Sequence, residues 1–125
     1  MNAPAKTYEY RYIRHDARVY FIGRNLHGKF HHRMLYTEPF YSREQKVLRN
    51  SVIGFVSHDL ATPRIERVIQ DCELAEISIG DLKQMSTMLR MPLVVELDKQ
   101  LQDDKEIISI YYFMPDSRLN KIKLY

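Results

Sequence analysis

Apolar and polar positions alternate along much of the first forty residues, which is the two-residue period of β-strands. Tyr8, Tyr10 and Tyr12 alternate with charged residues, so the first segment carries aromatic side chains on one face. Residues 18–22 are rich in β-branched and aromatic types and predict a second strand. Residues 23–28 contain two glycines and an asparagine, which predict a loop.

A third strand is predicted over residues 29–36, where apolar side chains alternate with lysine, histidine and arginine. The three strands together predict an antiparallel β-meander that ends at Pro39. Ser42 and Gln45 then have the spacing of a capping box, in which each side chain bonds the other residue's amide. This pattern predicts a short helix that ends near residue 50.

The second half of the chain begins with a compact apolar run, residues 52–57, that predicts a strand. Thr62 then has the character of a helix cap, and Pro63 suits the first helical position because no hydrogen-bond donor is needed there. Apolar residues at helical spacing continue from this start to Cys72. Residues 74–77 predict the next strand.

A second helix is predicted to begin at residues 78–81, where Asp81 favours the positive helix end, and to end before Pro92. Residues 93–97 and 106–113 then predict two strands around a polar loop. The last ten residues are basic with spaced apolar positions, and no element is assigned to them.

The order of elements over residues 52–97 is therefore β-α-β-α-β, and both connections are long enough for crossovers between parallel strands. We predict an α+β (mixed α/β) fold. In it, an N-terminal antiparallel β-meander joins the β-α-β-α-β unit and a C-terminal strand in a single mixed sheet with helices packed on it. A fully antiparallel sheet is the alternative. Residues 7–125 are expected to form one domain, and residues 1–6 a short flexible tail.

The composition agrees with one folded domain. The chain has 125 residues, of which 45% are hydrophobic, and a chain of this length can bury a core without disulfides or metals. Cys72 is the only cysteine and cannot form an internal disulfide, and the first residues lack an apolar signal core. The longest apolar runs fall far short of the roughly 20 residues of a membrane helix. We expect an intracellular protein of the cytoplasm or nucleus, with no membrane partner.

Charge is distributed unevenly along the chain. Residues 1–50 hold ten lysines and arginines against four acidic residues, a net charge of +6. Residues 51–125 hold nine against twelve, a net charge of −3. Such asymmetry favours an anionic partner, or attraction between opposite halves of neighbouring subunits, although a solvated basic face without a partner has the same pattern.

Residue types that could carry chemistry are present, but their spacing argues against a reaction centre. His27 and His31 have the four-residue spacing of metal ligands on a helix, yet a loop and a strand are predicted there. The consecutive residues 57–59 are Ser, His and Asp, and neighbours in sequence cannot line up as a catalytic triad. Cys72 fits a buried thiol, and glycine-rich phosphate motifs are missing. We expect no catalytic site, no metal and no cofactor.

The basic and aromatic first half is the remaining functional signal. We predict a non-enzymatic binding module that holds nucleic acid or another polyanion, with cations on phosphates and tyrosines stacked on bases. The predicted stacking residues are Tyr8, Tyr10 and Tyr12. The predicted polyanion-binding residues are Arg11, Arg14, Arg18, Arg24, Lys29, Arg33, Arg43, Lys46 and Arg49.

Two other functions remain open from the sequence. The first is a structural or scaffold protein that forms homo-oligomers or joins a larger protein assembly through edge strands and exposed tyrosines. The second is an enzyme or small-ligand binder with a pocket near residues 57–59, at the end of a predicted parallel strand. The nucleic-acid prediction depends on cations that gather on one accessible surface. It fails if carboxylates of the same subunit neutralise them.

Overall fold

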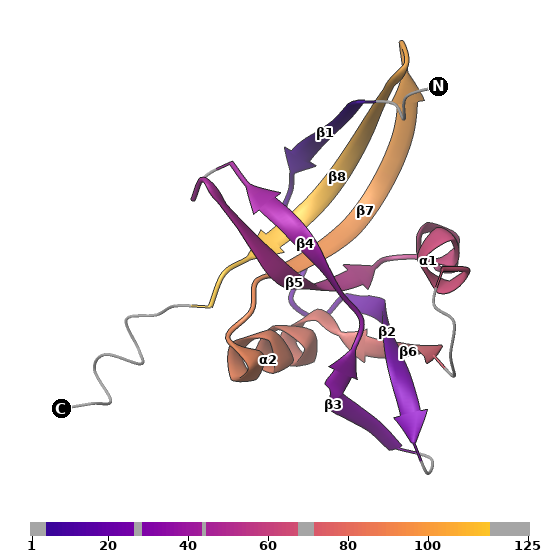
Figure 1. Cartoon of the computed structure of the whole chain (residues 1–125), viewed down its shortest axis with the longest axis vertical. Coiled ribbons are helices and arrows are strands. Elements are labelled where there is room, and N and C mark those ends of the chain that lie inside the picture. Colours follow the sequence, from indigo (N-terminus) through magenta and orange to yellow (C-terminus); the bar gives the residue numbers. More distant parts are fainter. Residues whose placement is uncertain (1–4, 27–28, 44, 68–71, 116–125) are drawn as a thin grey trace, which may run out of the picture.

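The computed structural model of the chain describes residues 5–26, 29–43, 45–67 and 72–115, with residues 24–26 and 29–34 described by their backbone alone. It contains one mixed sheet of eight strands and two helices (Figure 1). The elements are β1 (Ala5–Tyr10), β2 (Arg18–Leu26), β3 (Lys29–Leu35), β4 (Thr37–Ser42), β5 (Val47–Phe55), α1 (His58–Ile65), β6 (Cys72–Ser78), α2 (Ile79–Leu89), β7 (Leu93–Gln102) and β8 (Lys105–Phe113).

The sheet contains both parallel and antiparallel pairs, which confirms the predicted α+β class. Strand β2 pairs antiparallel with both β5 and β6, so these two strands run in the same direction on either side of it. Strand β5 pairs parallel with β7. Helices α1 and α2 therefore lie in two crossovers between parallel strands, as the β-α-β-α-β pattern predicts, and the fully antiparallel alternative is wrong.

The N-terminal strands are arranged differently from a simple meander. Strand β1 does not pair with β2. It pairs in parallel with the last strand, β8. Strand β3 pairs with β2, and after one residue, Tyr36, the chain continues as β4, which pairs with β5. The antiparallel part of this region thus consists of two hairpins, β2–β3 and β4–β5. Ala5 and Lys6, placed in the flexible tail from the sequence, are the first residues of β1.

Helix α1 begins earlier than the sequence pattern indicated. Ser57 caps it, since its Oγ accepts a hydrogen bond from the Leu60 amide at 3.4 Å, and Pro63 lies inside the helix. The prediction that Thr62 caps a helix reaching Cys72 is therefore wrong, and Cys72 begins strand β6, half-buried. The Ser57 hydroxyl stabilises this earlier start because it accepts a hydrogen bond from an amide in the first turn, which has no partner within the helix.

Residues 42–50 form a turn and a strand instead of the predicted short helix. The Ser42 Oγ accepts a hydrogen bond from the Gln45 amide at 3.2 Å, so the expected capping contact is present. It closes the turn between β4 and β5, however, and β5 begins at Val47. Lys46 adopts a left-handed backbone with φ of 54°, which reverses the chain. Glu44, inside the predicted capping box, lies outside the described residues.

The second predicted helix is confirmed as α2. The Ser78 Oγ accepts a hydrogen bond from the Asp81 amide at 3.2 Å at its start, and Arg90 ends it with a left-handed φ of 56°. Residues 98–105 were predicted as a polar loop, but residues 98–102 continue strand β7 and Lys105 begins β8. Only Asp103 and Asp104 form the turn, and both have the positive φ of a two-residue hairpin turn.

Each face of the sheet carries its own hydrophobic core, and each core includes one helix. Neighbours along a strand alternate between them, since Ile53 lies in one and Val52 in the other. The first core contains Ile22, Phe40, Ile53, Phe55, Ala61 of α1, Val94, Ile108 and Ile110. The second contains Val19, Phe21, Val52, Ile79 and Leu82 of α2, Leu93 and Val95.

Substitution of Leu82 should show how strongly α2 stabilises the second core. Leu82 is completely buried, so Leu82→Ala should lower the free energy of unfolding by about 2 to 5 kcal/mol through lost contacts and a residual cavity. Met88 lies on the same helix with 69% of its surface exposed, and Met88→Ala should change it by less than about 0.5 kcal/mol. Urea unfolding of both variants measures the difference. Equal losses would contradict this packing.

Candidate nucleic-acid interface

The predicted polyanion-binding cations do not form one surface. Three of the nine, Arg24, Lys29 and Arg33, have side chains outside the described residues. The other six divide into two groups of three. One group lies at the end of β1 and the start of β2, and the other on the β4–β5 hairpin.

The first group is neutralised by carboxylates of the same chain. Arg11 lies 3.4 Å from Glu9, and Arg18 lies 3.2 Å from Glu76 of β6. Arg14 donates two hydrogen bonds to the carboxylate of Asp16, at 2.9 and 3.2 Å. These exposed ion pairs contribute little stability, but each one reduces the positive potential that a polyanion would meet.

The second group, Arg43, Lys46 and Arg49, carries the unneutralised charge. No carboxylate of the described residues lies within 4.0 Å of these three side chains. Arg43 donates a hydrogen bond to the Tyr8 carbonyl at 2.8 Å, and its guanidinium lies 5.7 Å from the centre of the Tyr10 ring. The hairpin therefore brings to the open side of β1 an arginine that has no carboxylate partner among the described residues.

The three predicted stacking tyrosines differ in how far they reach solvent. Tyr8 and Tyr10 are half-buried against the first core, where Tyr8 meets the Phe40 ring edge-on at 5.1 Å. Tyr10 lies 6.0 Å from the Tyr112 ring. Tyr12, beyond the end of β1, is 97% exposed. Tyr12 is thus the best placed of the three for stacking, since Tyr8 and Tyr10 are both half-buried.

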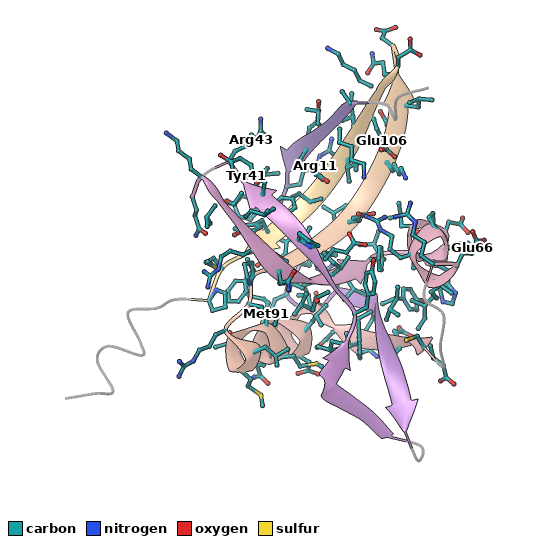
Figure 2. All side chains as sticks on the ribbon, in the orientation of Figure 1. Arg11, Tyr41, Arg43, Glu66, Met91 and Glu106 are labelled. Carbon is teal, nitrogen blue, oxygen red and sulfur yellow. The ribbon has the colours of Figure 1, made fainter. Side chains whose placement is uncertain are left out.

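These tyrosines and arginines line three adjoining hollows along β1, which we call the β1 groove. The largest, about 700 Å³, is lined by Thr7, Tyr8, Glu9, Tyr10 and Arg43. One neighbour of about 280 Å³ is lined by Tyr10, Arg11, Tyr12, Tyr111 and Tyr112, and one of about 260 Å³ by Lys6, Thr7, Tyr8, Tyr41 and Arg43. Figure 2 shows Arg11, Tyr41 and Arg43 in this region, around β1 and β4.

A second polar cluster, which the sequence did not predict, lies between α1 and the sheet. Arg64 of α1 donates hydrogen bonds to Glu38 of β4 at 3.0 Å and to Glu96 of β7 at 3.0 Å. Tyr36 donates its hydroxyl hydrogen to the same Glu38 carboxylate at 2.5 Å. The Arg64 guanidinium also lies 5.6 Å from the centre of the Phe55 ring. We call these four polar residues the Arg64 network.

Burial and hydrogen bonds act in opposite directions on the pKa values of the two carboxyl groups in the Arg64 network. Burial raises the pKa of Glu96, whose side chain is only 4% exposed, and the attraction of Arg64 does not fully offset this. Burial also acts on Glu38, but the hydrogen bonds from Arg64 and Tyr36 outweigh it and lower the pKa of that carboxyl. Burial and the hydrogen bond to Glu38 raise the pKa of Tyr36 to about 12. The network thus places one guanidinium between two carboxyl groups whose pKa values shift in opposite directions.

The Arg64 network is a structural contact between α1 and the sheet. Its polar groups bond one another, and the β1 groove is lined by other residues. One signal in the sequence pointed to it. Glu96 interrupts the apolar run of residues 93–97, and a carboxylate at such a position needs a buried partner.

The remaining candidate residues have structural contacts. Ser57 caps α1, and the neighbouring His58 packs its ring against Tyr20, with centres 4.4 Å apart. The alternative pocket near residues 57–59 does not coincide with the β1 groove. The side chains of His27 and His31 lie outside the described residues, so the prediction about metal stays untested there. No helix of the described residues is long and apolar enough to cross a membrane.

No family model matches this chain, and neither curated proteins nor solved structures give a significant match. Any function assigned to it therefore depends on the geometry of the chain itself.

Arg64→Met should destabilise the fold by about 3 to 5 kcal/mol, because two buried carboxylates lose their common partner. Without Arg64 the pKa values of both carboxyls rise, and protonation relieves the unpaired charge. The deficit relative to wild type should therefore be smaller near pH 4 than near pH 7. Urea unfolding at the two pH values measures it.

Arg67→Met is the matched control, because Arg67 is exposed in the turn that follows α1. This substitution should change the free energy of unfolding by less than about 0.5 kcal/mol. Adding Glu96→Gln to Arg64→Met should restore part of the loss. A deficit that is the same at both pH values would show that the carboxylates are not the cause.

Proposed function

We propose that this protein is a non-enzymatic binding module that holds single-stranded nucleic acid in the β1 groove. The observation that carries the proposal is that tyrosine rings, among them the almost fully exposed Tyr12, meet in one groove with Arg43, which has no carboxylate partner among the described residues. Tyr10 lies between Arg43 on one side and Arg11 with Tyr12 on the other. Proteins that bind single strands combine cations along the backbone with aromatic rings on which bases stack.

A single strand suits this groove better than a duplex. The tyrosines that line it are the groups that distinguish it from an ordinary basic surface, and stacking requires bases that are not already paired. The Tyr12 side chain is 97% exposed, although the next residue, Ile13, packs against the second core, and this exposure supports a role in contact with a ligand. The proposal needs no cofactor, and it keeps the intracellular location expected from the sequence.

The charge distribution supports a narrower site than the sequence predicted. Arg11, Arg14 and Arg18 are paired with carboxylates. The available phosphate contacts therefore come chiefly from Arg43, which lines the groove, and from Lys46 and Arg49, which lie on the same hairpin outside the groove lining. Each neutralised phosphate of a single strand contributes about 0.7 to the slope of log affinity against log salt. Three contacts give a slope of about −2, whereas nine would give about −6.

Binding of a fluorescent single-stranded oligonucleotide, followed by anisotropy across a salt series, tests this proposal. Wild type should bind at low salt with a slope near −2. Arg43→Ala should weaken binding about tenfold and make the slope less steep by about 0.7, because one phosphate contact is lost. Tyr12→Ala should weaken it about fivefold or more with the slope unchanged, since stacking is lost instead.

Arg14→Ala is the matched control, because it removes an exposed arginine outside the β1 groove and should leave affinity unchanged. No binding of single-stranded DNA or RNA at low salt would refute the proposal. Equal weakening by Arg14→Ala and Arg43→Ala would refute the assignment of the site and leave only diffuse attraction between charges.

A further inference from the structure

Two hairpin tips on this molecule have opposite charge. The turn of the β4–β5 hairpin, residues 41–49, holds three cations and one acid, a net charge of +2, and we call it the basic tip. The turn of the β7–β8 hairpin, residues 98–106, holds four acids and two lysines, a net charge of −2, and we call it the acidic tip. The two turns lie apart and point in different directions (Figure 1).

The same two tips carry most of the exposed large apolar side chains in the described part of the chain. Six such side chains are exposed, and four of them lie on the tips. Tyr41 and Leu48 of the basic tip, 52% and 64% exposed, are direct cross-strand partners, so they form one apolar surface beside the cations. Leu101 of the acidic tip is 71% exposed.

The charges of the acidic tip are available for a partner. Lys99 is paired with Glu106 at 2.7 Å, which leaves the two turn residues, Asp103 and Asp104, as the outermost acids. No lysine or arginine of the described chain lies within 4.0 Å of either carboxylate. The turn fixes both residues at the end of a paired hairpin, so little order needs to be gained when they bind.

We propose that the acidic tip of one copy docks on the basic tip of a second copy, so that copies of this protein associate head to tail. Asp103 and Asp104 meet the cations of the neighbour's hairpin, and Leu101 packs beside its Tyr41 and Leu48. Opposite charges steer and align such a contact, while two basic tips or two acidic tips repel each other. Different surfaces meet on the two copies, which produces rings or open chains instead of a closed symmetric dimer.

The association does not depend on nucleic-acid binding. Each tip is a single hairpin turn, so the contact is small and of the weak, transient class. Both interactions use Arg43, Lys46 and Arg49, and a bound nucleic acid therefore competes with the acidic tip of a neighbour. The test is made on the full chain with no nucleic acid present, so that the two proposals fail or succeed separately.

Sedimentation velocity across a concentration series tests head-to-tail association. At low salt the average mass of wild type should rise with concentration, and at about 0.5 M salt it should return to the monomer, because screening at that ionic strength shortens the attraction to a few ångströms. Reversal of either tip, by Asp103→Lys with Asp104→Lys or by Lys46→Glu with Arg49→Glu, should weaken association at least tenfold. Glu66→Lys, an exposed acid away from both tips, is the control and should associate as wild type does.

Mixing the two reversed variants provides the decisive measurement. One retains a native basic tip and the other a native acidic tip, so the mixture should associate although neither variant does so alone. Asp103→Asn with Asp104→Asn removes the charge with residues that tolerate a left-handed backbone, and it separates loss of charge from damage to the turn. A monomer at all concentrations, unchanged association of the reversed variants, or a mixture that stays monomeric would each overturn the proposal.

Discussion

One buried guanidinium decides how the two hairpins of this fold are held relative to each other. Arg64 of α1 bonds Glu38 on the β4–β5 hairpin and Glu96 on the β7–β8 hairpin at the same time. Glu96 is buried and Glu38 is partly buried, so displacement of α1, β4 or β7 would leave a desolvated charge without its partner. The hydrophobic cores on the two faces would tolerate small shifts of these elements. The hydrogen bonds between Arg64 and the carboxylates oppose such shifts, because they require specific distances and angles.

The position of β4 in turn determines the surface for which we propose a function. Two residues beyond Glu38, Phe40 packs its ring between those of Tyr8 and Tyr112, which come from the first and last strands. Three residues further on, Arg43 bonds the backbone of β1. The groove is therefore assembled from segments that are far apart in the sequence, and its shape depends on a network that it does not itself contain.

The sequence predicted the elements whose signals lie within a few residues. Helix α2 and the β-α-β-α-β order were correct, because periodicity and caps are local. The start of α1 was wrong since Thr62 and Pro63 form an equally good local signal, and only the structure shows that Ser57 caps the helix first. Pairings between residues that are far apart in the chain could not be predicted, because no local pattern in the sequence marks them. The ion pair of Arg18 with Glu76 is one of them. Arg11 with Glu9 and Arg14 with Asp16 are pairs of near neighbours, and the three pairs together neutralise half of the described cations of the predicted surface. The charge count identified the basic region, but not which charges remain free.

The parallel pairing of β1 with β8 has a consequence for how the protein is made. Ala5 lies beside Lys105, a hundred residues later in the chain, so β1 has no partner until about a hundred further residues have been translated. During that time its tyrosines and its open backbone are exposed to other nascent chains and to chaperones. Closing so long a loop also places this protein among slow folders. Strand β1 is thus the element whose pairing has to wait longest for its partner among the strands described.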